Sequence, residues 1–317
     1  MKTVDILVIG AGPAGMTAGL YAARSGREVA MVEKALPGGQ MGTAHWIENY
    51  PGFPDGIGGA ELAMQMQQQA EKAGVRVVYQ AVQSLARQKE GFLVTPGGKD
   101  EPFLARTVIL ALGGQPRPLG VEGEDRLRGR GVSYCAACDG AFFRGKKTVV
   151  VGGGETAVAD ALFLAGLCAR VTLVHRRDTL RCTPVMAERV KSEEKIAMCW
   201  DSTVTALHEE NGKLCGVTVQ NRKTGETQIL PADGLFIAVG HTPDTALCRG
   251  LCALDEGGYI LTDERMHTDV PGLFAAGDCR KKNLRQISTA VGDGAIAAEE
   301  AASFLLEEMG QGGTQRK

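Results

Sequence analysis

The sequence has little net charge and no long apolar run. Lysine and arginine number 35 against 37 acidic residues, giving a net charge of −2 over 317 residues. This balance lacks the basic excess typical of proteins that bind nucleic acids or membrane surfaces. The longest apolar candidate, Ala161–Ala169, falls well short of the roughly 20 residues that a membrane span needs. No signal-peptide pattern follows Met1-Lys2, so we expect a cytoplasmic protein without nucleic-acid or membrane partners.

The sequence also lacks a second pair of cysteines at the three-position spacing of Cys135 and Cys138. Cys135 and Cys138 are three positions apart, and the remaining cysteines are scattered singles. A structural zinc site needs two more ligands, usually another close pair, and no histidine pair has zinc-finger spacing. We therefore expect no metal site. An odd, scattered set of nine cysteines suits a reducing cytoplasm better than a secreted disulfide framework.

The stretch Cys135–Gly140 carries the clearest chemical signal. Two thiols at this spacing can close a small disulfide ring and reopen it. Asp139 directly follows the second cysteine, where thiol–disulfide exchange needs a group that gives or takes a proton. We interpret Cys135, Cys138 and Asp139 as catalytic. A pair of buried structural cysteines is the alternative that this stretch alone leaves open.

A dinucleotide-binding fingerprint opens the chain. The strand-like run Val4–Ile9 leads into the glycine turn Gly10–Gly15, the helical stretch Met16–Ser25 and a second strand that ends at Glu33. Glycines let the backbone approach a pyrophosphate at a helix N-terminus, and the acid accepts from ribose hydroxyls. The expected contacts are Gly10, Gly12, Pro13, Ala14, Gly15 and Glu33.

The same pattern restarts after the cysteines. Thr148–Val151 predicts a strand, Val158–Gly166 a helix and Val171–Val174 the next strand. The turn between the first strand and the helix supplies the expected cofactor contacts Gly152, Gly154, Glu155 and Thr156. The chain thus carries two dinucleotide folds of α/β class.

The two copies differ at the position that follows their second strand. Glu33 lies 23 residues after Gly10, and His175 lies at the same offset from Gly152. Where the first copy has an acid, the second copy has a basic group. This group consists of His175, Arg176, Arg177 and Arg181. Arginines there neutralise a 2′-phosphate, so we expect a free ribose at the first site and NADPH at the second. An exposed basic strand end is the alternative.

Two nucleotide sites and a dithiol imply an electron relay. A nicotinamide gives up a hydride, whereas a disulfide accepts two electrons and becomes two thiolates. Direct transfer between them is uncommon, so we expect a flavin between them, bound as FAD at the first site.

The sequence strongly resembles the low-molecular-weight bacterial thioredoxin reductases, which are class II pyridine nucleotide-disulfide oxidoreductases. The matching stretches run nearly end to end in family order: Gly10–Gly15, Gly38–Gln40, Glu48–Phe53, Cys135–Gly140, Gly152–Ala157, His175–Arg177 with Arg181, Gly240–Pro243, Phe274–Asp278 and Arg285–Gln286.

This resemblance implies two Rossmann-like domains of the three-layer ββα type, the second inserted in the first. Residues 1–116 and 246–317 would form the FAD domain, and residues 117–245 the NADPH domain with the dithiol. It further implies a homodimer through the FAD domains, a thioredoxin or thioredoxin-like partner, and a rotation that presents the dithiol to flavin and partner in turn. Cys138 would lie next to the flavin and Asp139 would be the acid/base.

The resemblance also implies cofactor contacts outside the two glycine turns. These are Gly39, Gln40, Asn49, Val82, Gly277, Asp278, Arg285, Gln286 and Ile287 for FAD, and Gly240 on the NADPH side. Four positions depart from the family pattern: His45 interrupts a usually threonine-rich run, Cys279 replaces an aliphatic residue, and Ala141 and Leu284 replace aromatic ones. We interpret His45 as a structural histidine and Cys279 as a buried small hydrophobe.

Three other functions remain open from the sequence. A related reductase could serve a peroxiredoxin partner, and a related oxidase could make disulfides in small molecules. A non-catalytic NADPH or redox sensor is a hypothesis of a different class. The complete dithiol and the two nucleotide sites favour turnover and thioredoxin.

Overall fold

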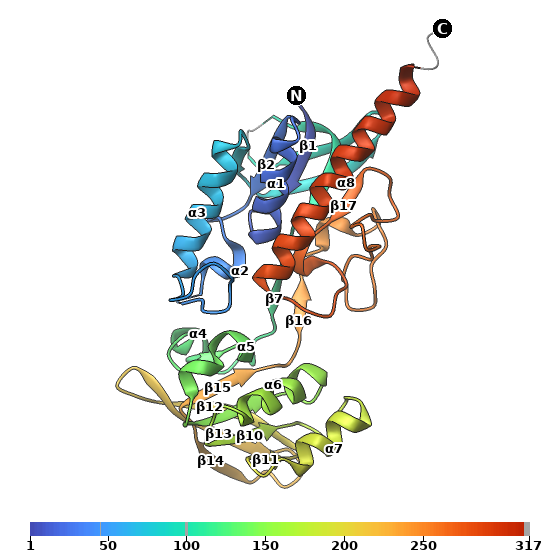
Figure 1. Cartoon of the computed structure of the whole chain (residues 1–317). Helices are drawn as coiled ribbons and strands as arrows, with labels where there is room; N and C mark the ends of the chain where they lie inside the picture. Colours follow the sequence, from blue (N-terminus) through green and yellow to red (C-terminus); the bar gives the residue numbers. More distant parts are fainter. Residues whose placement is uncertain (45, 99–100, 314–317) are drawn as a thin grey trace. The chain divides into compact units, whose positions relative to one another are not determined.

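The computed structural model describes residues 1–44, 46–98 and 101–313, and it divides into two compact units (Figure 1). Unit 1 comprises residues 1–115 and 242–317, and unit 2 comprises Pro116–His241. The dithiol therefore lies in one continuous segment of chain. The boundaries expected from the sequence are 116/117 and 245/246. His45 lies outside the described residues.

A mixed sheet forms the centre of unit 1. Strands β3 (Arg76–Tyr79), β2 (Val29–Glu33), β1 (Lys2–Ile9) and β6 (Phe103–Leu110) lie side by side and parallel. The second half of β6 pairs in parallel with β17 (Leu273–Ala275). Its first half pairs with the antiparallel hairpin of β5 (Gly91–Pro96) and β4 (Val82–Gln88).

Three helices cover one face of this sheet: α1 (Pro13–Arg24), α3 (Gly59–Lys72) and α8 (Ile287–Gly313) (Figure 1). Because side chains alternate along a strand, Ile6 and Val8 pack under these helices, while Leu7 and Ile9 join a second core on the opposite face. The second core also holds Cys248 of the short helix η2 (Ala246–Cys248). Both faces of β1 are buried, as its unbroken apolar run predicts.

Unit 2 has three layers. Its central parallel sheet has the order β11 (Ile196–Cys199), β10 (Arg170–Val174), β9 (Lys147–Val151), β15 (Gly234–Ile237) and β8 (Val132–Ser133). Helices α6 (Glu155–Ala165) and α7 (Pro184–Ser192) supply apolar residues to one core, against which Val150 packs. Val149 and Val151 pack in the other core with the antiparallel strands β12 (Ser202–Glu210), β13 (Lys213–Asn221) and β14 (Thr227–Pro231).

The chain passes between the units twice, through β7 (Gly114–Pro116) and β16 (His241–Pro243), which pair with each other. The amide of Arg117 donates to the carbonyl of Gly240 at 2.9 Å, and that of Asp244 donates to Gly113 at 3.2 Å. This register is antiparallel. The two connections therefore form one narrow ribbon.

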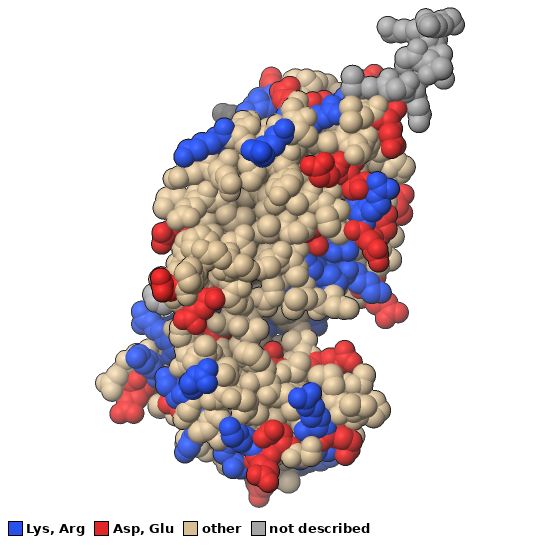
Figure 2. Space-filling view, in the orientation of Figure 1, with Lys and Arg blue, Asp and Glu red and all other residues tan. Residues whose placement is uncertain are grey.

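The predicted α/β class with two Rossmann-like domains is confirmed, since each unit repeats strand, glycine turn, helix and strand around a parallel sheet. Among the described residues, no helix is long and apolar enough to cross a membrane. On the visible face of unit 1 the charged side chains lie mainly toward the edges, whereas on unit 2 charges of both signs are interspersed (Figure 2).

Candidate active site

The two cysteines of the Cys135–Gly140 stretch are joined. Cys135 and Cys138 form a disulfide with a Cα–Cα distance of 5.3 Å. Cys135 precedes the single turn α5 (Ala136–Asp139), and its sulfur accepts the amide N–H of Cys138 at 3.1 Å. A backbone donor at this sulfur favours its thiolate once the disulfide opens. The predicted disulfide is confirmed.

Asp139 is held at the other end of this turn. Its Oδ2 lies 2.6 Å from the hydroxyl of Ser133, the last residue of β8. Burial raises the pKa of the Asp139 carboxyl, while the Ser133 hydrogen bond and the charge of Arg128 oppose that rise. A carboxyl with a raised pKa beside a disulfide is suited to exchanging a proton with a leaving thiolate.

Tyr134 ties the dithiol to the start of unit 2. Its hydroxyl donates to Oε1 of the buried Glu124, and burial together with that carboxylate raises the pKa of Tyr134. The same carboxylate accepts the amide N–H groups of Leu119 at 3.0 Å and Gly120 at 2.8 Å. Glu124 therefore fixes the chain that leaves β7 against the residue that precedes Cys135.

The first glycine turn is shaped to admit a ligand. A Cβ on Gly10 would lie 2.3 Å from the carbonyl oxygen of Ala111, and one on Gly15 would lie 1.8 Å from that of Gly10. A Cβ on Gly12 would meet nothing within 4 Å. Two glycines thus serve close backbone packing, and the third leaves open space at the N-terminus of α1, where a pyrophosphate fits.

Glu33 lies at the end of β2 beside this turn. Its carboxylate accepts the amide N–H of Ala11 at 2.6 Å and that of Ala35 at 2.9 Å. Two backbone donors hold the side chain at the carboxyl edge of the sheet, where this fold binds nucleotides. The remaining acceptor capacity of the two oxygens fits ribose hydroxyls.

The predicted polar contacts of the first site occur in two pairs. The Gln40 amide, in the turn α2 (Gly39–Gly42), donates to Gln115 at 2.6 Å, and the Asn49 amide donates to Gln286 at 3.2 Å. Val82 is the partly buried first residue of β4, where it packs against the second core of unit 1. Arg285 stacks on the ring of Tyr259 at 4.2 Å, directly before Gln286 and Ile287, the first residue of α8.

The carboxyl of Asp278 has an oxygen that could accept a hydrogen bond from a bound cofactor. Its Oδ1 is buried and has no hydrogen-bond partner among the described residues. Burial raises the pKa of this carboxyl, and Lys282 and Arg285 oppose the rise. A buried oxygen without a hydrogen bond destabilises the protein, so a donor group of a bound cofactor would supply the hydrogen bond that Oδ1 lacks.

The turn that carries Asp278 is anchored from α8. The buried Asp293 accepts the amide N–H of Gly277 at 3.0 Å and pairs with Lys282 at 2.8 Å and Arg280 at 3.2 Å. The side chains of Asp293 and Lys282 are only 10% and 8% exposed. The ion cluster therefore fixes Gly277, which has a φ of 78°, and the carboxyl that follows it.

The second glycine turn repeats the first. A Cβ on Gly152 would lie 2.4 Å from the carbonyl oxygen of Ala238, whereas the nearest atom to one on Gly154 is 4.0 Å away. Glu155 and Thr156 begin α6 and are exposed. Gly240, at φ 113°, accepts from Arg117 where the chain leaves the unit. The open position again lies at a helix N-terminus.

The basic group beside this turn separates into two parts. His175 is buried, its ring lies against Gly153, and its Nε2 is 3.0 Å from the carbonyl oxygen of Thr179. Burial lowers the pKa of His175. Arg176 and Arg177 are exposed, as is Arg181, whose amide N–H donates to Gly153 at 2.6 Å. The arginines are therefore free to meet a phosphate, while the histidine supports the turn from beneath.

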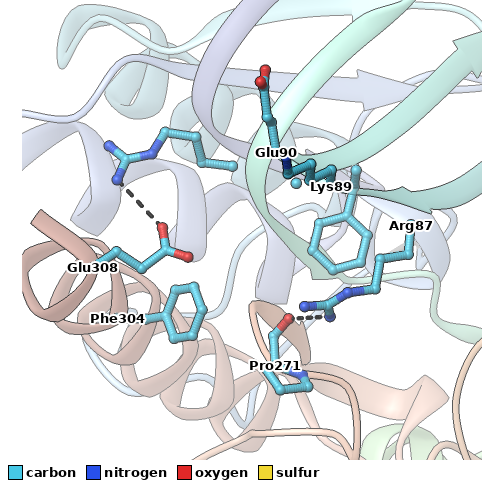
Figure 3. A pocket seen from close by; sticks show the side chains of 9 residues that line it. Arg87, Lys89, Glu90, Pro271, Phe304 and Glu308 are labelled. Atoms are coloured by element: carbon cyan, nitrogen blue, oxygen red, sulfur yellow. Dashed lines mark hydrogen bonds and ion pairs between the residues drawn. The ribbon is translucent and has the colours of Figure 1, made fainter. Parts of the chain in front are cut away.

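A small pocket in unit 1 is unrelated to these residues (Figure 3). It lies between the β4–β5 hairpin and α8, where Arg87 donates to the carbonyl of Pro271 at 2.6 Å and Arg106 pairs with Glu308 at 3.4 Å. None of the predicted site residues lines it. Within the described part of the chain, no cluster of three or more His, Cys, Asp or Glu side chains could hold a metal ion.

Residues 4–294 match the family described as pyridine nucleotide-disulphide oxidoreductase. The chain belongs to this family. Membership of this family implies a flavin and a pyridine nucleotide as cofactors. The predicted family resemblance is confirmed.

Known members of this family resemble the oxidoreductase along almost its whole length. The thioredoxin reductase of Bacillus subtilis (strain 168) is 46% identical over 306 residues, covering 96% of each chain. That of Listeria monocytogenes serovar 1/2a is 44% identical, covering 96% of this chain and 95% of the relative. The crystal structure of thioredoxin reductase from Streptococcus pyogenes MGAS5005 has a TM-score of 0.90 at 46% identity, covering 96% and 99%.

Several residues of this oxidoreductase's site escaped the sequence motifs. Ser133 bonds to both Cys135 and Asp139, Glu124 holds Tyr134 next to the dithiol in the sequence, and Asp293 anchors the Asp278 turn. Ser133 and Tyr134 are close neighbours of Cys135 in sequence, which is a weak signal. Glu124 and Asp293 act across many residues, so the sequence pattern alone offers no sign of their contacts.

Proposed function

We propose that this oxidoreductase is an NADPH-dependent thioredoxin reductase that passes electrons from NADPH through FAD to Cys135–Cys138 and then to thioredoxin. The observation that supports this most directly is the closed disulfide beside the partly buried carboxyl of Asp139, in the unit that carries the exposed Arg176, Arg177 and Arg181. The thioredoxin reductases that resemble the chain favour this function over a peroxiredoxin reductase, an oxidase or a sensor.

FAD would occupy unit 1. Gly10, Gly12, Pro13, Ala14 and Gly15 would receive its pyrophosphate, and Glu33 a ribose. The polar groups that would surround its ring end are Gly39, Gln40, Asn49, Gly277, Asp278, Arg285, Gln286 and the start of α8 at Ile287. Val82 would make an apolar contact. When bound, the flavin accepts a hydride and releases its two electrons to a disulfide.

NADPH would occupy unit 2. Gly152, Gly154, Glu155 and Thr156 line the N-terminus of α6, with Gly240 at the neighbouring strand end. Arg176, Arg177 and Arg181 would bind the 2′-phosphate. His175, packed under Gly153, would hold the turn in shape. Because guanidinium groups fit phosphate with paired donors, the site would discriminate against NADH.

The chain's own cysteines then complete a balanced exchange. The Cys135–Cys138 bond takes up two electrons, and two protons make two thiols. One thiolate attacks the disulfide of thioredoxin and forms a mixed disulfide, which expels one thioredoxin thiolate. The second cysteine attacks the mixed disulfide, so Cys135–Cys138 closes again and the second thioredoxin thiolate leaves. Asp139 supplies and recovers a proton, and Cys138 would be the sulfur nearest the flavin.

The motion between the two half-reactions would use the β7–β16 ribbon. Only these two strands connect the units along the chain, and they pair with each other. A rotation of one unit relative to the other would change the backbone dihedral angles of this ribbon, as hinge residues do. We propose that residues 1–116 with 246–317 act as the FAD domain and residues 117–245 as the NADPH domain.

We further propose a cytoplasmic homodimer formed through the FAD domains. Apart from the Cys135–Cys138 bond, the cysteines are free thiols, as suits a reducing compartment. The face over α1 carries few charges in Figure 2, and Tyr21 of α1 and Ile296 of the adjacent α8 are 43% and 41% exposed. Light scattering of wild type and of Ile296→Glu tests the dimer, which the variant should weaken.

Steady-state NADPH oxidation with and without thioredoxin tests the function. We expect turnover only when NADPH and thioredoxin are both present. No turnover with any thioredoxin tried would refute the proposal. In Cys138→Ser, thioredoxin reduction should be lost while NADPH still bleaches the flavin under anaerobic conditions. The matched control is Cys215→Ser, an exposed free cysteine of unit 2 that should leave turnover unchanged.

A further inference from the structure

A second group of thiols lies in unit 1, away from the Cys135–Cys138 bond in the sequence. Cys248, Cys252 and Cys279 are free and belong to one apolar cluster with Leu247 and Leu251. Cys248 and Cys279 are fully buried, and Cys252 is partly exposed. All three are interpreted from the sequence as scattered singles, but Cys248 and Cys252 are only four positions apart, and the fold adds Cys279 to them.

A tight turn brings Cys252 back to Cys248. Arg249 has φ −62° and ψ 122°, and Gly250 has φ 74°, which together match a type II turn. The carbonyl oxygen of Cys248 accepts the amide N–H of Leu251 at 3.0 Å and that of Cys252 at 3.4 Å. Glycine takes this positive φ without strain, so the turn is encoded in the sequence.

The turn places the two cysteines in one apolar cluster with Leu247 and Leu251. The interaction between the two thiols raises the pKa of Cys248 and lowers the pKa of Cys252. Cys252, whose pKa is lowered, is also the partly exposed member of the pair. A small solute can therefore reach its sulfur, as reactive cysteines require.

Cys279 stands apart within the cluster. Its thiol is completely buried and lies 3.4 Å from the carbonyl oxygens of Leu110 and Ala276. Burial raises the pKa of this thiol to about 11. The protonated thiol of Cys279, hydrogen-bonded to backbone carbonyls, is a poor nucleophile. Cys248 and Cys252 are therefore the reactive pair of this cluster.

We propose that Cys248 and Cys252 form a second, peroxide-oxidisable dithiol in this protein. The Cys252 thiolate attacks a hydroperoxide, its sulfur gains oxygen, and the peroxide bond breaks to release water or an alcohol after protonation. The Cys248 thiol then attacks the resulting sulfenic acid, forming an S–S bond and releasing water. Each disulfide thus consumes one hydroperoxide and returns to two thiols when a dithiol reductant supplies two electrons.

Arg249 lies between the two cysteines, which makes the disulfide directly measurable. Trypsin separates Cys248, in Thr224–Arg249, from Cys252, in Gly250–Arg265. The flavin-loaded protein is treated with hydrogen peroxide, its remaining thiols are alkylated under denaturing conditions, and its tryptic peptides are weighed. We expect the two peptides to appear joined with the loss of two hydrogens, and dithiothreitol to separate them.

The control variants change each paired cysteine in turn and one unrelated cysteine on another tryptic peptide. Cys252→Ser and Cys252→Ala should each abolish the joined species, and Cys215→Ser should not affect it. In Cys248→Ala, Cys252 should accumulate as a sulfenic acid that dimedone traps. A joined peptide containing Met266–Arg280, and hence Cys279, would overturn the pairing. Cys252 reaching sulfinic acid beside an intact Cys248 thiol would overturn the dithiol, as would full recovery of both thiols.

Discussion

The hydroxyl of Ser133 lies 2.6 Å from Oδ2 of Asp139, so a residue before the dithiol holds the acid that follows it. The same hydroxyl oxygen accepts the amide N–H of Cys135 at 3.0 Å. One side chain therefore connects both ends of the redox turn.

Removal of that hydroxyl should change the pH dependence of thioredoxin reduction. The hydrogen bond favours the ionised carboxyl and lowers the pKa of Asp139 against the rise caused by burial. In Ser133→Ala this pKa should rise further, and the corresponding limb of the pH–rate profile should move to higher pH. Ser133→Thr keeps the hydroxyl and should restore the wild-type profile. An unmoved limb in the alanine variant would show that another group titrates.

Asp160 should make the protein less stable as pH rises. Burial raises the pKa of this α6 carboxyl to about 6, above its ordinary value of 3.8. The folded state then binds more protons than the unfolded state between these values, so stability falls from about pH 4 to pH 6. Asp160→Asn should therefore increase the free energy of unfolding at pH 8 by up to about 3 kcal/mol and raise the melting temperature accordingly. At pH 3.5 the substitution should change little.

A surface aspartate of the same unit serves as the control for that measurement. Asp178 is exposed, and its hydrogen bond to Lys223 lowers its pKa. Asp178→Asn should give no gain at pH 8. If Asp160→Asn is no more stable than wild type at that pH, the carboxyl is not a destabilising charge.

The arginine pair should decide the choice of nicotinamide cofactor. Each charge-assisted bond to a phosphate contributes about 1.5–3 kcal/mol, so Arg176→Ala with Arg177→Ala should raise the KM for NADPH at least about 10²-fold. NADH lacks the phosphate, and its KM should hardly move. Arg189→Ala, an exposed arginine at the end of α7, is the matched control. Equal losses with both cofactors would refute the phosphate role.

Asp293 should affect flavin affinity through the turn it anchors. Asp293→Asn leaves Lys282 and Arg280 without their anion in a buried place, which typically costs about 3–5 kcal/mol. The Asp278 turn should loosen, so FAD should bind the apoprotein more weakly, by about tenfold or more, as measured by flavin fluorescence.

Another carboxylate of α8 provides the comparison. Glu300 pairs with Arg265 and His267, away from Gly277 in the hydrogen-bond network. Glu300→Gln should lower stability and leave FAD affinity unchanged. If both variants weaken FAD binding equally, general destabilisation explains the effect and the anchor does not.

The sequence predicted the parts of the site that follow from local pattern. Both glycine turns, Glu33 and the cysteine pair are read from neighbours along the chain, and the structure gives them the expected strand–turn–helix setting. Boundaries were less accurate. Helix α6, which the sequence predicted to begin at Val158, begins at Glu155. The last residues of the second glycine turn already have helical backbone.

Features that depend on packing were not predictable. The run Ile196–Thr205 reads as one strand, but a turn at Trp200-Asp201, with Asp201 at φ 50°, divides it between two sheets. The bond from Tyr134 to Glu124 and the packing of Cys279 in one cluster with Cys248 likewise arise only when the chain folds. Apolar periodicity reports burial, and it does not report which polar groups meet.

The β7–β16 pairing also makes unit 2 a module. Since residues 116–241 begin and end on hydrogen-bonded neighbours, the two ends of this segment are adjacent, as in domains that tolerate insertion and transfer. A short loop from Gln115 to Thr242 could close unit 1, and Pro116–His241 could be moved as one cassette into another flavoprotein. The dithiol and the nucleotide preference would travel together.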